Sequence, residues 1–244
     1  MHSEFGDDDG DGGGGGHAGH MAASFTDLMA SLMVIFVLLF VATVNNATAS
    51  RKKVQDDLIT VLRKDLAVRL GDSTLIRTDE RDPFAVVIVM PDSLLFERGS
   101  AQIQRGGQSF LSDAAPILSD ILCADQMRGY IDNVVVEGHT DTTYAGFQRT
   151  PDYGRAGNMR LSQARSMEVV TTSLDSLATR RPDALDCFRR MLSASGRGQE
   201  EPLIGISGDD SRQRRVVFKI RVKADLARQL TGSVSKTGRV EFRQ

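Results

Sequence analysis

A continuous apolar segment from Phe25 to Val44, FTDLMASLMVIFVLLFVATV, constrains the fold more than any other feature of the chain. A helix of about 20 residues is roughly 30 Å long, which matches the hydrocarbon core of a bilayer. We therefore predict a transmembrane helix over residues 24–46. The rest of the 244 residues is long enough to form one folded domain with its own core.

Asp27 is the only charged residue within this apolar segment. A carboxylate costs several kcal/mol near the centre of a bilayer and less towards its edge, so its presence needs a reason. One explanation is structural: an acid in the first helical turn suits the helix dipole, with Ser24 or Thr26 as the N-cap. The other is functional, in which Asp27 binds and releases an ion at the membrane edge. The local sequence leaves both open.

The segments flanking the membrane helix differ in character. Residues 1–23 are rich in glycine and aspartate, which predicts a disordered tail rather than a cleavable signal peptide. Residues 47–80 are predicted to form a helical linker, because apolar residues recur there at helical spacing. This stripe either pairs with a copy of itself or packs onto its own domain, and it consists of Val54, Leu58, Val61, Leu62, Leu66 and Leu70.

Composition excludes several classes of function. With 30 basic and 32 acidic residues, the chain has a net charge of −2 and no basic patch for nucleic acid. Cys123 and Cys187 lack zinc-site spacing, so no metal is predicted. The two cysteines are either buried thiols or a disulfide, which would contribute about 4 kcal/mol. The chain has no GxSxG, no P-loop and no Cys/His nucleophile pair, so we expect neither an enzyme nor a cofactor.

Residues 81–224 show strands and helices in alternation, which predicts an α+β domain with two layers and its helices on one face of the sheet. Four strands are expected, at 84–90, 131–138, 192–198 and 214–222. Helices are expected over 110–122, from about Asn158 onwards, and over 182–192. Residues 225–244 are predicted to form a C-terminal tail outside this domain.

Two motifs in this domain point to a family. EGHTD covers Glu137–Asp141 at the end of a predicted strand, and NMRLSQAR covers Asn158–Arg165. Further matches follow the same order along the chain: Phe96, Gly99, Ser100, Ala101, Gly196, Gly198, Pro202, Arg214, Arg215 and Val216. From about residue 84 to 222 the chain resembles the OmpA C-terminal peptidoglycan-binding domain, shared with Pal lipoproteins and MotB stator subunits.

The residue types in these motifs suit a zwitterionic ligand. A carboxylate such as Asp141 can accept from an ammonium, and Arg165 can hold a carboxylate in a bidentate fork. The resemblance implies that this ligand is the diaminopimelate of the cell-wall stem peptide. It further implies that Asn158 and Leu161 line the pocket and that Thr140 shapes its rim.

Two neighbouring features are treated separately. His139 is expected to brace the loop by hydrogen bonding rather than to bind ligand. The loop over residues 142–157 is longer than the family usually has, and its larger side chains either add contacts to the pocket or cover it: Tyr144, Phe147, Arg149 and Tyr153.

The combination of a lone membrane acid with this domain resembles MotB rather than Pal. The run FTDLMASLMVIFVLLFVATVNN resembles the MotB-like subunits of Zorya antiphage defence systems more than flagellar stators, whose N-terminal tail is usually basic rather than acidic and glycine-rich. The resemblance implies that Asp27 carries H⁺ or Na⁺, and that the chain is a homodimer inside a ring of MotA-like (ZorA-like) membrane subunits. It also implies a single pass of the inner membrane, with a cytoplasmic N-terminus and a periplasmic domain on peptidoglycan. A flagellar MotB subunit and a passive OmpA/Pal-like tether remain alternatives, and Arg51–Lys53 argue for the opposite orientation.

Overall fold

The computed structural model describes residues 16–70, 75–143 and 151–223, and the chain divides into two compact units, Met1–Thr48 and Ala49–Gln244. Most of the predicted N-terminal tail and all of the C-terminal tail from residue 225 lie outside the described residues. Residues 16–23 are an exception to the predicted disorder, because their backbone is helical.

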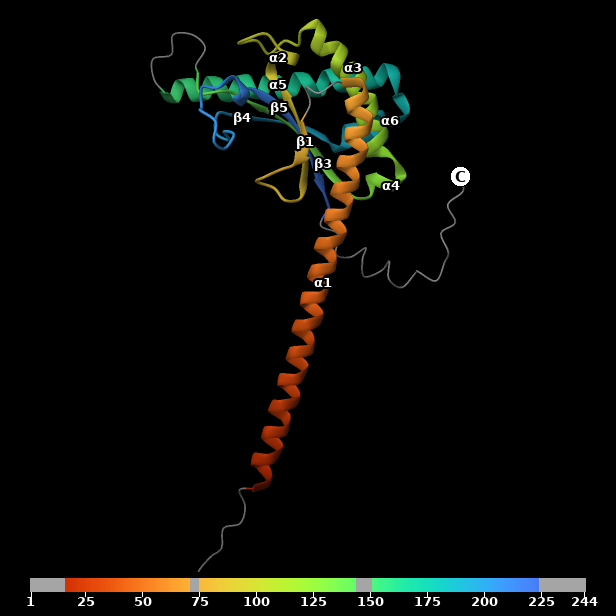
Figure 1. Cartoon of the computed structure of the whole chain (residues 1–244), viewed down its shortest axis with the longest axis vertical. Coiled ribbons are helices and arrows are strands. Elements are labelled where there is room, and N and C mark those ends of the chain that lie inside the picture. The colour runs from red at the N-terminus through yellow and green to blue at the C-terminus, as the bar shows by residue number, and fades with distance from the viewer. Residues whose placement is uncertain (1–15, 71–74, 144–150, 224–244) are drawn as a thin grey trace, which may run out of the picture. The chain divides into compact units, whose positions relative to one another are not determined.

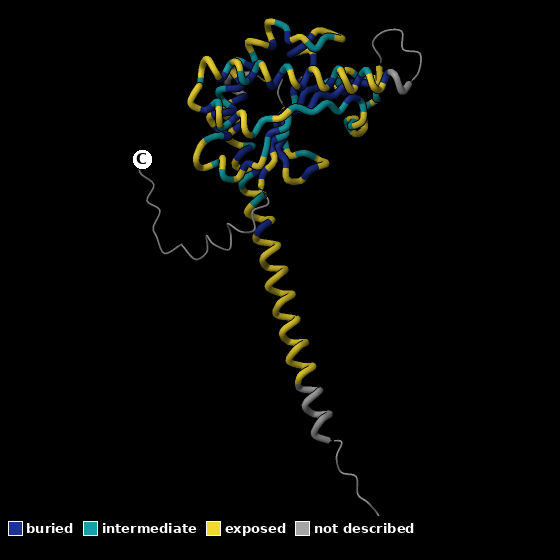
Figure 2. Tube along the Cα trace, turned by 180° about the vertical axis from the view of Figure 1, so that it is seen from behind, coloured by how far each residue is buried: buried dark blue, intermediate teal, exposed yellow. Residues whose placement is uncertain are grey.

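The first unit consists of the N-terminal part of α1 (Gly16–Leu70). From Phe25 onwards this helix is long and apolar enough to cross a membrane: an 18-residue stretch of it has a mean hydropathy of 2.5 and contains no buried residue. Figure 2 shows residues 25–46 as exposed throughout. The helix begins eleven residues before Asp27. Since only the first turn has unpaired N–H groups for a cap to satisfy, the capping explanation for Asp27 is wrong.

The second unit is built on a five-stranded sheet. Its strands are β1 (Leu75–Thr78), β2 (Ala85–Pro91), β3 (Ile131–His139), β4 (Leu192–Gly198) and β5 (Arg215–Val222). They lie in the order β1-β2-β5-β3-β4, and all neighbours are antiparallel except β3 and β4. The four predicted strands are confirmed, and β1 is an additional one that the prediction missed.

Helices cover one face of this sheet, as predicted. They are α2 (Asp92–Leu95), α3 (Arg105–Cys123), α4 (Asp125–Arg128), α5 (Pro151–Arg180) and α6 (Pro182–Met191), with a short 3₁₀ turn, η2 (Ser211–Gln213). Figure 1 shows α3, α5 and α6 gathered beside the strands. Helix α5 starts seven residues before Asn158, so the predicted 142–157 loop is too long at its C-terminal end. Its residues 144–150 lie outside the described part of the chain.

Alternate residues of the three central strands form the core with the helices. On β5, for example, Val216, Phe218 and Ile220 are buried while the residues between them face the other side of the sheet. Further core side chains come from β2, β3, α3, α5 and α6, and include Val86, Ile88, Met90, Val134, Val136, Leu111, Leu118, Leu122, Val169, Leu177 and Phe188. This arrangement is the predicted two-layer α+β sandwich.

The C-terminal part of α1 belongs to the same core. Leu58, Leu62 and Leu66 are at most 1% exposed and lie within the core cluster. Gln55 also donates to the carbonyl of Pro83 at 2.9 Å. The buried part of the apolar stripe, Leu58, Leu62 and Leu66, therefore packs onto its own domain. The compact unit that contains this domain begins at Ala49 and includes both this part of the helix and β1, whereas the sequence analysis began the domain at residue 81.

Cys123, at the end of α3, and Cys187, in α6, are joined by a disulfide across 64 residues of sequence. Their Cα atoms are 6.1 Å apart. Closing a loop of this length contributes about 4 kcal/mol to stability by restricting the unfolded chain. Of the two open alternatives, the structure contains the bonded one.

Candidate functional site

Two glycines let α5 lie directly against the ends of β3 and β4. A Cβ atom on Gly138 would lie 2.2 Å from the carbonyl oxygen of Ser162, and one on Gly196 would lie 2.6 Å from the amide nitrogen of Gln163. Larger residues would push the helix away from the sheet. The glycines of the EGHTD and SGRG segments thus bring the NMRLSQAR motif next to Asp141.

Arg165 is the largest of the fully buried side chains, with 2% of its surface exposed. Its Nη1 lies 2.7 Å from Oδ1 of Asp92, a residue of α2 that is itself 4% exposed. Its Nε donates to the carbonyl of Ser100 at 2.7 Å, and its guanidinium lies 5.1 Å from the ring centre of Phe96. Arg165 is therefore held by α2 and the loop that follows it.

Asp141 is also buried, with 3% of its surface exposed, and is engaged by other residues. One carboxylate oxygen accepts from the backbone N–H of Thr143 at 3.1 Å. The other forms a close ion pair with Nη1 of Arg214, which immediately precedes β5. The Nε of Arg214 also lies 4.0 Å from Asp92.

These four residues, Asp92, Asp141, Arg165 and Arg214, form one cluster of two acids and two arginines, which we call the charge quartet. Burial raises the pKa of Asp92, against the opposing influence of Arg165 and Arg214. Burial also lowers the pKa of Arg165, against the influence of Asp92. Each charge therefore depends on its partners, because an isolated charge at these depths would be strongly disfavoured.

The other residues predicted for the site have supporting positions. Asn158 is buried, and its side-chain amide donates to the carbonyl of Asp141 at 3.0 Å and to Oε1 of Gln199 at 3.0 Å. It therefore fixes the backbone that carries Asp141. Thr140 is buried rather than at a rim, and Leu161 is half-buried. The side chains of Tyr144, Phe147, Arg149 and Tyr153 lie outside the described residues.

The structure therefore brings Asp141 and Arg165 into one cluster but gives each an internal partner. A zwitterion could be bound by exchange, with its ammonium replacing Arg214 on Asp141 and its carboxylate replacing Asp92 on Arg165. The sequence analysis did not predict a role for Asp92. For Arg214 the sequence analysis predicted no role beyond its match to the family. A second arginine among the matching residues could have indicated a partner for Asp141.

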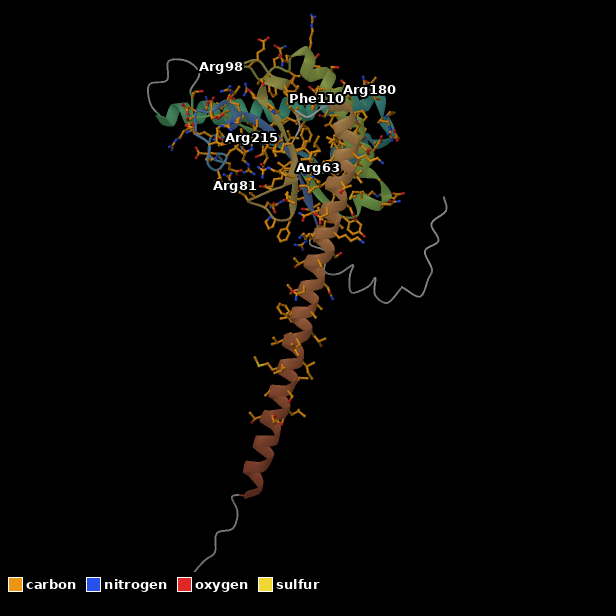
Figure 3. The ribbon with its side chains drawn as sticks, in the orientation of Figure 1. Arg63, Arg81, Arg98, Phe110, Arg180 and Arg215 are labelled. Carbon is orange, nitrogen blue, oxygen red and sulfur yellow. A yellow bond between two sulfur atoms is a disulfide. The ribbon has the colours of Figure 1, made fainter. Side chains whose placement is uncertain are left out.

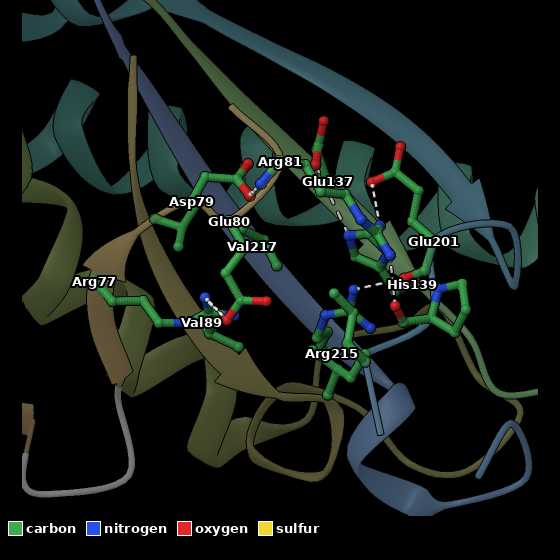
Figure 4. Close-up of a pocket in the computed structure, with 14 residues that line it drawn as sticks. Arg77, Asp79, Glu80, Arg81, Val89, Glu137, His139, Glu201, Arg215 and Val217 are labelled. Atoms are coloured by element: carbon green, nitrogen blue, oxygen red, sulfur yellow. Dashed lines mark hydrogen bonds and ion pairs between the residues drawn. The ribbon is translucent and has the colours of Figure 1, made fainter. Parts of the chain in front are cut away.

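A second polar cluster occupies the opposite face of the sheet, where Glu137 and His139 of β3 are 4% and 3% exposed. In Figure 4, His139 lies between Glu137, Glu201 and Arg215. Its Nε2 is 3.8 Å from Glu137, and its Nδ1 has no hydrogen-bond partner among the described residues. The expectation that His139 braces the loop through hydrogen bonds is therefore wrong.

Glu137, His139 and Glu201 present ligand atoms within 4.8 Å of one another, which is close enough for three ligands of one metal ion. Their carboxylates are already neutralised, however. Nη2 of Arg197 lies 2.5 Å from Glu137, and Nη1 of Arg81 lies 3.3 Å from Glu201. A cation would have to displace these arginines, so the chemistry favours a structural ion-pair cluster.

Stability should depend on pH through His139. Burial, together with nearby cations such as Arg215 and Arg197, holds the pKa of His139 well below its ordinary value of 6.5. The unfolded chain then binds a proton below pH 6.5 that the folded chain does not bind. Stability is complete above that pH and falls below it, by up to about 1.4 kcal/mol per pH unit. Urea unfolding should therefore need less urea at pH 5.5 than at pH 7.5.

The variant His139→Gln is the matched control for this effect, because it keeps a neutral polar side chain and removes the titration. We expect its loss of stability between pH 7.5 and pH 5.5 to be much smaller. The aspartates with lowered pKa values, such as Asp79 and Asp82, titrate below this window. An unchanged loss in the variant would show that His139 is not the group responsible.

No family model matches the chain. The Zorya protein ZorB of Escherichia coli (strain Crooks) is 27% identical over 215 residues, covering 83% of this chain and 88% of that protein. The chain is homologous to ZorB. A second ZorB, from Escherichia coli O139:H28, is 25% identical over 163 residues and covers 63% of the chain and 60% of that protein. The first ZorB match is longer than Ala49–Gln244, so it reaches into the N-terminal unit.

Among solved structures, the putative MotB like protein from Desulfovibrio vulgaris shares the fold. It has a TM-score of 0.50 and 18% sequence identity, and the match covers 73% of this ZorB homologue and 98% of that chain. The likeness agrees with the predicted fold class: an apolar helix followed by an α+β domain whose fold resembles that of this MotB like protein.

Proposed function

We propose that the chain is a stator-type subunit of an ion-driven motor in the inner membrane, anchored to peptidoglycan through its folded domain. The observation that carries the proposal is the occurrence, in one chain, of a lone acid within an apolar membrane helix and a buried acid–arginine cluster in a MotB-like fold. The homology to ZorB supports the same assignment and favours a role in Zorya antiphage defence.

Asp27 is the proposed ion carrier. It is exposed on α1, in the fourth turn, where the helix backbone needs no cap. Protonation would neutralise its carboxylate against apolar surroundings, and ionisation would favour a polar partner. The transported ion is H⁺ or Na⁺, and no cofactor is required. The polar partner would come from a MotA-like ring around a homodimer of this chain.

The charge quartet is the proposed wall site. A zwitterionic residue such as diaminopimelate can replace the internal pairs of Asp141 and Arg165 with pairs of its own, so that no buried charge is left alone. The exchange explains how a site that is closed without ligand can still accept one. Wall binding requires the domain to lie in the periplasm, with the N-terminus in the cytoplasm.

The basic residues after the membrane helix oppose this orientation by the positive-inside tendency. One of them has a structural role in the folded unit: the guanidinium of Arg51 lies 4.0 Å from the centre of the Phe84 ring. An interaction of this kind stabilises an arginine at the surface of the domain. Arg51 therefore carries less weight as a topology signal than its charge alone suggests.

Co-purification tests the proposal. The full chain, tagged at its C-terminus and extracted in detergent from its own host, should bring with it a membrane protein present in several copies. The same preparation should bind purified cell-wall sacculi, and Asp141→Asn should weaken that binding. Wall binding without a membrane partner would instead favour a passive OmpA/Pal-like tether. A motility defect on deletion would favour a flagellar MotB subunit, and a C-terminal reporter active only in the cytoplasm would contradict wall anchoring.

A further inference from the structure

A cavity of about 370 Å³ adjoins the charge quartet. It is lined by Asp92 and Arg214 but by neither Asp141 nor Arg165. Its volume lies within the range of sites that bind small ligands. The cavity therefore shares Asp92 and Arg214 with the charge quartet but does not include the two residues proposed to bind the zwitterion.

The walls of this cavity combine apolar surface with an excess of positive charge. Apolar contacts come from Val89, Phe96 and Leu203. Four arginines line the cavity against one acid, Asp92, and we call the cavity the arginine pocket: Arg98, Arg212, Arg214 and Arg215. A ligand that fits this lining carries an anionic group on an apolar body.

Two of these arginines have carboxylate partners, and two have none within the part of the chain that the structure describes. Arg212 pairs with Asp210 at 2.7 Å, and Arg214 belongs to the quartet. Among the described residues, Arg98 and Arg215 form no ion pair with a carboxylate. Arg215 is 7% exposed, and its guanidinium donates to the carbonyls of Gln213 at 3.0 Å and Glu201 at 2.9 Å. Burial and the nearby Arg81 lower its pKa to about 10, which an anion in the pocket would reverse.

Of the four arginines, Arg98 is the one whose removal should affect ligand binding without affecting the fold. It lies on the loop after α2, which is closed by a bridge between Phe96 and Ile103 and turned by Gly99 at a φ of +77°. Arg98 is exposed and is labelled in Figure 3. Because its side chain supports no other described part of the fold, its removal should leave the folded domain intact.

We propose that the arginine pocket binds a second carboxylate of the same wall peptide whose zwitterionic residue occupies the charge quartet. This inference rests on the proposed wall-anchoring function and names a further part of its ligand. A guanidinium fork matches a carboxylate in shape and charge, and the apolar walls suit the peptide stem that carries it. The pocket thereby selects an acidic peptide over a free amino acid.

The test compares two ligands on the full chain in detergent by titration calorimetry. One is free diaminopimelate. The other is the tripeptide alanyl-γ-glutamyl-diaminopimelate, in which the γ-linkage leaves an α-carboxylate of glutamate free. Loss of a charge-assisted hydrogen bond predicts that Arg98→Ala weakens binding of the tripeptide by about tenfold or more. Binding of diaminopimelate should be unchanged.

Arg105→Ala is the matched control, because it removes an exposed arginine from the nearby start of α3 that does not line the pocket. It should leave both affinities unchanged. If Arg98→Ala bound the tripeptide with unaltered affinity, or lost affinity equally for both ligands, the proposed role of the arginine pocket would be wrong. The wall-anchoring proposal would not be affected by either result. If the unsubstituted chain bound neither ligand, the wall-anchoring proposal itself would fail, and the pocket with it.

Discussion

Asp27→Asn is expected to abolish protection against phage while the membrane complex still assembles. The amide has nearly the same size and polarity as a protonated carboxyl but cannot release a proton or hold a cation by charge. If Asp27 carries the ion, the loss should be complete rather than partial. Plaque counts with the complete system measure the activity, and co-purification of the partner subunits measures assembly.

Asp57→Asn provides the matched control for Asp27→Asn. Asp57 lies on the same helix, in the part that belongs to the folded unit, and it is exposed. This substitution removes the same charge and should leave protection intact. Asp27→Glu keeps the ionisable group and should keep part of the activity. Full protection by the assembled Asp27→Asn complex would rule out ion transfer through this residue.

Arg165→Met is expected to lower the free energy of unfolding by about 3–5 kcal/mol, because it leaves the buried carboxylate of Asp92 without its partner. It should also abolish binding to sacculi. Urea unfolding of the full chain in detergent, followed by circular dichroism, measures the first effect. Arg180→Met is the control, because Arg180 and Asp113 form an ion pair that is about half exposed and should contribute at most about 1 kcal/mol.

A double variant separates stability from binding. Asp92→Asn combined with Arg165→Met removes both charges of the pair, so we expect it to recover part of the lost stability. It should not recover binding to sacculi, since the arginine fork is still absent. Recovery of both properties would mean that Arg165 has only a structural role, and the charge quartet would then not be the wall site.

The parts of the fold that were predictable are those with a strong local signal. The apolar run of β2 and the alternation of β5 gave their strands, because burial of one or both faces selects such patterns. The strand β1 was missed because Leu75–Thr78 is a four-residue edge strand with one buried side chain, which leaves almost no pattern to detect. The early start of α5 was missed because residues 151–157 contain two glycines and one proline, which usually indicate a loop.

The candidate site was predictable only in part, for a similar reason. Asp141 and Arg165 could be found because each lies in a recognisable motif. Their partners could not, since the pairing of Arg165 with Asp92 joins residues 73 positions apart in sequence and depends on how α2 packs beside α5. Motifs record which side chains are present, whereas the packing of separate elements decides which of them neutralise one another.

The three leucines near the end of α1 limit how this chain can change during evolution. Leu58, Leu62 and Leu66 follow one another at four-residue intervals along a single face. Since each residue of a helix is rotated by about 100° from the last, deleting one residue between them would turn part of this face out of the core. A flexible spacer could gain or lose residues freely. This segment cannot, so changes in length should be confined to residues that precede Leu58 or follow Leu66.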